Sequence, residues 1–190
     1  MSTICTLSRY VRFCHDSFIS SNHARKRQRR NPAGTGRAEL DSHADTGCAG
    51  PDCAVLSTTG KMVNVYPFSS ESNKVTNIPI GTVAYAVDDT KTGDTVLLVM
   101  HEQLIFGDRL TCSLINPNQM RAYGVKVNDT PKQYDRLSTH SILIDRDGGT
   151  LFEVPLELNG VMSYFNVRKP TQSELEPGRC ERLELTSEEP

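Results

Sequence analysis

The dipeptide Asn159-Gly160 constrains the fold more than any other feature of the chain. It lies between two β-type runs, residues 153–158 and 161–167. Asn and Gly both tolerate the positive φ angles of a two-residue hairpin turn, so the pattern predicts two antiparallel strands. The turn-rich residues 146–149 also separate two β-type runs and predict a second hairpin. We therefore expect residues 141–167 to form a β-hairpin unit.

The middle of the chain shows the same alternation of strand and turn. Residues 62–66 and 75–87 are strand candidates on either side of a polar loop. The turn-rich residues 88–94 come next, followed by the run 95–101. This last run is almost continuously apolar, so it is expected to be a strand buried on both faces. Together these patterns predict a mainly β protein.

One short helix is expected within this β pattern. Asn116 is a favourable helix-capping residue, Pro117 suits the first helical position, and Gly124 suits the position after the last turn. The sequence therefore predicts a helix over residues 117–123, directly after a short strand at 113–115.

The C-terminal residues carry a weaker helix signal. Thr171 and Glu174 have the spacing of a capping box and predict the start of a short helix. From Glu176 the chain becomes acidic and is expected to fray. The turn-rich residues 31–36 end the basic arm, which is expected at 1–36, and a β-hairpin extension with an acidic tail is expected at 132–190.

The net charge of -2 hides a strong asymmetry. Residues 1–37 carry eight Lys or Arg and one acidic residue, a net +7, whereas the rest carries 13 basic and 22 acidic residues, a net -9. A segment of this composition cannot bury a core, so the arm is expected to be solvated. Contact with nucleic acid phosphates is the other interpretation. Its candidate residues are Arg25, Lys26, Arg27, Arg29 and Arg30.

The six cysteines and the hydropathy pattern address localisation. The first 20 residues lack the apolar stretch of a secretory signal, so free thiols in an intracellular protein are expected, with cytoplasm and nucleus both open. The longest clean apolar run, 96–100, is too short to span a membrane. A zinc site remains an alternative, with His43, Cys48, Cys53 and Cys112 as its candidate ligands.

One short segment suggests catalytic chemistry. An apolar residue, Leu40, precedes six residues of an expected active-site loop: Asp41, Ser42, His43, Ala44, Asp45 and Thr46. A carboxylate on a tight loop at a strand end can act as a general base or acid. A hydroxyl beside it can hold the loop, and small residues allow a second loop to approach closely.

This segment resembles the active-site signature of retropepsin-type aspartic proteases. Residues 106–109, 113–119 and 163–171 extend the resemblance to the protease region of copia-type retrotransposon polyproteins, over about 37–187. The resemblance implies a closed β-barrel subunit at 37–131 with Asp41 as the catalytic residue. Tyr66 and Phe68 would lie on a flap over the substrate.

The resemblance also implies partners and a mechanism. Because the chain carries one such motif, a symmetric homodimer would be needed to bring two Asp41 carboxyl groups to about 3 Å, where they share one proton, the known arrangement in aspartic proteases. The implied substrate is a polyprotein, and no cofactor or metal is expected.

His43 is the departure from the family pattern, which has Gly at this position. An imidazole there either perturbs the carboxyl groups, requires a different loop, or marks a site that no longer cleaves. Two alternatives therefore stay open besides the aspartic endopeptidase. One is a catalytically inactive fragment derived from a retroelement, and the other is a nucleic-acid-binding or zinc module driven by the arm.

Overall fold

The computed structural model describes residues 7–10, 35–43, 45–66, 74–146 and 148–188. Strands account for 52% of the chain, and the described residues contain one α-helix. This confirms the prediction of a mainly β protein.

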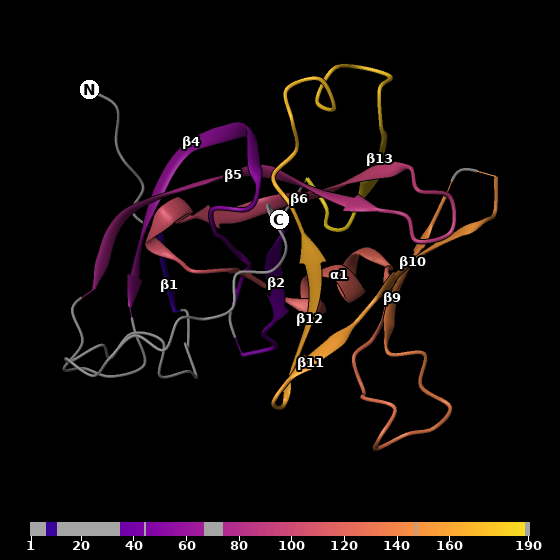
Figure 1. Ribbon diagram of the computed structural model, residues 1–190. Coiled ribbons are helices and arrows are strands. Elements are labelled where there is room, and N and C mark those ends of the chain that lie inside the picture. The colour runs from indigo at the N-terminus through magenta and orange to yellow at the C-terminus, as the bar shows by residue number, and fades with distance from the viewer. Residues whose placement is uncertain (1–6, 11–34, 44, 67–73, 147, 189–190) are drawn as a thin grey trace, which may run out of the picture.

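Ten strands form one large mixed sheet (Figure 1). Neighbouring strands follow the order β1-β4-β5-β6-β3-β7-β2-β12-β11, and β13 pairs with β6. The bounds are β1 Leu7–Tyr10, β2 Gly36–Leu40, β3 Cys48–Ala49, β4 Ala54–Tyr66, β5 Val75–Asp88, β6 Thr95–Ile105, β7 Ser113–Ile115, β11 Glu157–Asn159, β12 Met162–Val167 and β13 Glu181–Glu184. The strand β1 pairs in parallel with the end of β4, so four residues of the expected arm belong to the sheet.

The sheet does not close into the barrel that the resemblance implies. Its outer strands, β1 and β11, are not paired with each other in the described part of the chain, so the strand order stays open. One bridge, between Ala86 in β5 and Arg168 just after β12, connects the two halves through backbone hydrogen bonds of 2.9 and 3.0 Å. Barrel closure needs a continuous ladder around the sheet. The expectation of a closed β-barrel is therefore wrong for the described residues.

Both expected hairpins are present. The strands β11 and β12 pair in antiparallel fashion, but the two-residue turn between them is Gly160-Val161, one position later than expected, because Asn159 pairs with Met162 as the last residue of β11. Gly160 has a positive φ of 65°, whereas Asn159 does not have a positive φ. The strands β9 (Ser141–Asp145) and β10 (Leu151–Pro155) pair across the second turn, of which residue 147 lies outside the described residues. With β8 (Lys126–Asn128) they form a separate three-stranded sheet.

The helix α1 (Pro117–Tyr123) also matches its prediction. The side chain of Asn116 accepts hydrogen bonds from the backbone N–H groups of Asn118 and Gln119, and Gly124 ends the helix with φ of 101°. Met120 is fully buried and fixes the helix against the core.

The C-terminal expectations need correction. Residues 172–179 form turns instead of a helix, although Thr171 and Glu174 make both capping-box hydrogen bonds, at 2.8 and 3.4 Å. Pro177 follows closely, and the residue before a proline disfavours the helical conformation. The acidic tail does not fray either, because β13 pairs in parallel with β6 and Leu185 is fully buried.

The core connects the parts that the sequence suggested were separate. Its main cluster combines Tyr85 and Met100 with Phe152, Phe165 and Leu185, all of them almost completely buried. The strand β12 pairs with β2, and β13 pairs with β6. Strand pairing and packing therefore cross the boundary expected at residue 131.

Candidate active site

Asp41 is the first residue after β2, an interior strand that lies between β7 and β12 in the large sheet. Its backbone N–H donates a 2.9 Å hydrogen bond to the carbonyl of Ile115, the last residue of β7. This bond continues the parallel pairing of β2 with β7 one residue beyond the strand. The Asp41 residue is 9% exposed. A mostly buried carboxyl group thus lies at a strand end, where the motif predicted it.

The loop that follows is braced by side chains and a carbonyl from distant parts of the chain. The Thr46 hydroxyl, fully buried, donates to the Glu102 carbonyl at 3.0 Å. The Gln119 amide nitrogen donates to the same hydroxyl at 3.0 Å, and the Gln119 amide oxygen accepts from the Gly47 N–H at 2.9 Å. One side chain on α1 therefore holds two consecutive residues of the loop.

His43 contacts Asp41 while remaining at the surface. Its backbone N–H donates to Asp41 Oδ1 at 2.9 Å, and its Nδ1 lies 3.8 Å from the same oxygen. The imidazole side chain is 69% exposed. A histidine is therefore accommodated in this loop without entering the core. Ser42 and Asp45 are exposed as well, whereas Ala44 lies outside the described residues.

Gly47 allows β6 to pass close to the loop. A Cβ atom at this position would lie 1.9 Å from Gln103 Oε1, so a side chain cannot be added without moving Gln103. Gln103 is fully buried and donates to the His101 carbonyl at 2.9 Å. Its Oε1 atom has no hydrogen-bond partner among the described residues.

The thiols of Cys48, Cys53 and Cys112 near the loop are poor nucleophiles. Burial, with a smaller contribution from the charge of Asp41, raises the pKa of Cys48 to about 12. Burial likewise raises the pKa of Cys53 and of Cys112, each to about 11. Thiolates are the reactive and metal-binding form, and these groups stay protonated at neutral pH.

The alternative zinc site is not assembled in this fold. Among the described residues, no group of three or more His, Cys, Asp or Glu side chains is arranged to hold a metal ion. His43, Cys48, Cys53 and Cys112 therefore do not form the site that their spacing allowed.

Of the remaining residues predicted from the sequence, the structure describes only Tyr66. Tyr66 ends β4, one strand of the long β4–β5 hairpin, at the end next to the expected flap tip. Phe68 and the basic run, Arg25 to Arg30, lie outside the described residues. The structure thus brings His43 into contact with Asp41, and it leaves the basic run of the arm untested.

Sequence patterns missed four residues that build this site: Gly47, Glu102, Gln103 and Gln119. Each acts through a contact with a residue more than 50 positions away in the chain. Gln119 belongs to a segment that supports the family resemblance, which is the one signal that could have identified it. Glu102 contributes its backbone carbonyl, and no side-chain pattern can predict such a role.

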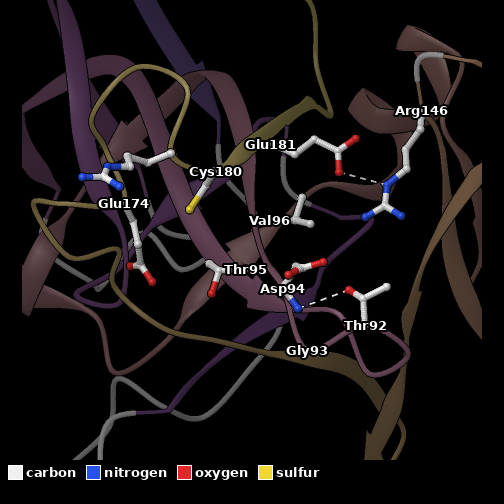
Figure 2. Close-up of a pocket in the computed structure, with 10 residues that line it drawn as sticks. Thr92, Gly93, Asp94, Thr95, Val96, Arg146, Glu174, Cys180 and Glu181 are labelled. Atoms are coloured by element: carbon white, nitrogen blue, oxygen red, sulfur yellow. Dashed lines mark hydrogen bonds and ion pairs between the residues drawn. The ribbon is translucent and has the colours of Figure 1, made fainter.

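A polar cavity of about 660 Å³ lies away from the candidate site (Figure 2). Arg146 contacts Asp89 at 3.3 Å and Glu181 at 3.0 Å, and its guanidinium lies 4.7 Å from the centre of the Phe152 ring. Its charge is therefore already paired with acidic neighbours, and no residue of the Asp41 loop lines this cavity.

Comparison with known proteins and a search of the described residues for membrane-spanning helices were both negative. No protein-family model, no curated protein and no solved structure matches the chain. Among the residues that the structure describes, no helix is both long and apolar enough to cross a membrane.

Proposed function

We propose that the chain is one subunit of a retropepsin-like aspartic endopeptidase of the copia type. In the proposed mechanism, two copies of Asp41 share one proton across a symmetric homodimer. One carboxylate removes a proton from the attacking water, and the other carboxyl group protonates the peptide carbonyl oxygen. The proposed substrate is a polyprotein.

The observation that carries this proposal is the placement of Asp41. A carboxyl group that is 9% exposed lies directly after a central strand, in a loop fixed by Gln119 and by the Glu102 carbonyl. General acid–base catalysis requires a carboxyl group with a defined position. Bracing from α1 and β6 provides that position, and the motif Asp-Ser-x-Ala-Asp provides the residue types.

Two features of the surface support a dimeric site. Ser42, His43 and Asp45 surround Asp41 and are exposed, so a second copy of the loop can approach this face. The strands β4 and β5 of the hairpin are the longest described, with 13 and 14 residues, and β4 is exposed over residues 55–62. A long hairpin of this kind can cover an extended peptide, as the flap interpretation requires.

His43 is compatible with this mechanism in the single subunit. Its side chain points to solvent, and the only contact with Asp41 shorter than 3 Å uses the backbone N–H, which any residue except proline supplies at this position. The inactive retroelement fragment remains the competing function, because a dimer would bring two imidazoles near the shared carboxyl pair.

The test measures cleavage of casein by the purified chain between pH 4 and 7, with and without pepstatin. We expect pepstatin-sensitive cleavage whose specific activity falls when the protein is diluted, because dilution dissociates a homodimer. Absence of cleavage at concentrations at which sedimentation shows a dimer would favour the inactive fragment. Cleavage that pepstatin does not inhibit would contradict the aspartic mechanism.

A further inference from the structure

One edge of β6 connects the C-terminal strand to the candidate catalytic loop. The strand β13 pairs with β6 over Val96 to Val99, and the Leu185 N–H then donates to the Val99 carbonyl at 2.9 Å. Farther along the same edge, the Leu104 N–H donates to the Gly47 carbonyl at 3.0 Å, where β3 pairing begins. The C-terminal segment and the Asp41 loop therefore occupy consecutive stretches of one edge.

Thr186 fills the gap between these two stretches. Its hydroxyl accepts a hydrogen bond from the His101 N–H at 2.7 Å and donates to the His101 carbonyl at 3.3 Å. Thr186 is 3% exposed and His101 is 4% exposed. One buried hydroxyl thus replaces both backbone hydrogen bonds that a neighbouring strand would make with His101.

His101 belongs to a β-bulge in β6. Gly81 pairs with Gln103 and Val83 pairs with Met100, so two residues of β6 face one residue of β5. The second bulge residue, Glu102, has a positive φ of 55°, a conformation that is unfavourable for a residue with a side chain. Bulges reorient backbone groups next to functional sites and need surrounding contacts to hold them.

The bulge presents the carbonyl that braces the candidate site. Glu102 accepts the hydrogen bond from the buried Thr46 hydroxyl at 3.0 Å. The contacts from Thr186 to His101, along the backbone to Glu102, and from Glu102 to Thr46 form a continuous path. They connect the C-terminal segment with the loop that carries Asp41.

We propose that Thr186 is a positioning residue, which holds the His101–Glu102 bulge in the geometry that fixes the Asp41 loop. The positioning of the loop stands independently, whereas its consequence for cleavage rests on the proposed endopeptidase function. Residues 181–186 are thereby an integral part of the site, although they contribute no group to the chemistry.

Gln103 and Thr82 also contact His101, at 2.9 and 3.0 Å, but on the side of the C-terminal segment Thr186 supplies both hydrogen bonds to its backbone. The cavity of Figure 2 borders β13 at Glu181, and a second cavity of about 310 Å³ extends along Glu181 to Glu184. In this strand only Leu183 is buried, and Leu185 follows it. Because β13 is not enclosed by neighbouring side chains, loss of the Thr186 hydrogen bonds is expected to loosen the edge.

The experiment compares Thr186→Val, which removes the hydroxyl, with Thr186→Ser, which keeps it. Thr171→Val is the control, because it removes a threonine hydroxyl of the same C-terminal segment whose hydrogen bonds are to Ser173 and Glu174 instead of His101. Native-state hydrogen exchange is measured at the amides of Gly47 and Leu104, with amides of the β8–β9–β10 sheet as the reference. The kcat and KM for casein cleavage are measured on the same samples.

We expect Thr186→Val to speed exchange at Gly47 and Leu104 by about fivefold or more relative to the reference amides, because a buried hydrogen bond is lost. We also expect kcat to fall by at least about fivefold with little change in KM. Thr186→Ser and Thr171→Val should behave like the parent chain at these two amides.

Unchanged exchange at Gly47 and Leu104, or equal acceleration at the reference amides, would overturn the positioning role. Loss of loop protection in Thr186→Ser as large as in Thr186→Val would also overturn it. If the parent chain cleaves nothing while the exchange pattern is as expected, the endopeptidase function fails and the positioning of the loop stands.

Discussion

At the scale of single residues, Asp41 depends on contacts that are distant in the chain. The carboxyl group and its exposed neighbours belong to one short motif, so a local sequence pattern is enough to identify them. Gln119, in contrast, reaches the loop across more than 70 positions. A local pattern can show which residue type the chemistry requires, but it cannot show which distant amide braces the loop.

The first prediction concerns Gln119. Gln119→Leu removes both the donor to Thr46 and the acceptor for the Gly47 N–H, so we expect the free energy of unfolding to fall by about 1–3 kcal/mol, as for a buried group that loses its partner. We also expect kcat to fall by more than the loss of folded protein accounts for, because the loop is no longer fixed. Denaturant unfolding and kcat are the two measurements.

Asn118→Leu is the matched control, because Asn118 is its neighbour on the same helix and is exposed. It should leave kcat near that of the parent chain. A Gln119→Leu protein that retains full kcat would show that the Gln119 bracing has no role in positioning Asp41.

At the scale of elements, the sequence predicted those strands whose partners are close in the chain. The Asn159-Gly160 pair and the α1 caps are local signals: the hairpin forms with its turn shifted by one residue, and the helix appears where expected. The strand β13 was missed because its partner, β6, lies more than 80 residues earlier. Leu183 and Leu185 show the alternation of a strand, but the acidic composition outweighed this short signal.

The capping box is a different case, because its hydrogen bonds form without a helix. Glu174 accepts from the backbone N–H of Thr171 and pairs with Arg168 through contacts of 2.7 and 2.9 Å. Arg168 also donates to Asp88 at the end of β5. The box therefore helps to attach the segment that leads to β13, and Pro177 stops any helical continuation.

The second prediction concerns pH. Hydrogen bonds from Arg168, together with smaller contributions from Thr171, lower the pKa of Glu174 to about 2. The unfolded value is about 4.3. A pKa that is lower in the folded state stabilises the fold above the unfolded value, and this contribution is lost as the pH falls from about 5 to about 2.

We therefore expect the stability difference between the parent chain and Glu174→Gln to shrink as the pH is lowered through this window. Urea unfolding followed by circular dichroism at several pH values provides the measurement. Glu176→Gln, whose carboxylate is more exposed and lies 3.5 Å from Arg179, is the control for removal of a surface charge. A difference for Glu174→Gln that stays constant from pH 6 to pH 2.5 would contradict the prediction.

At the scale of the whole molecule, one sheet and one main core include residues from both sides of the expected boundary at 131. The resemblance implied a compact unit separate from a C-terminal extension, yet β12 lies directly beside β2, the strand that precedes Asp41 (Figure 1). Whether a sheet closes depends on strand order and register over the entire chain. No local pattern contains that information, so the sequence predicted the class of fold and missed its topology.

The central claim is that Asp41 activates water, and Asp41→Asn tests it most directly. The measurement is the initial rate of casein cleavage between pH 4 and 7 by the parent chain, Asp41→Asn and the control Asp45→Asn, each shown by circular dichroism to be folded. An amide cannot act as a general base, so we expect Asp41→Asn to lose about 100-fold or more in rate. Asp45→Asn, altered at an exposed loop residue, should lose much less. A parent chain that cleaves casein together with an Asp41→Asn variant that cleaves it equally fast would contradict the assignment of Asp41.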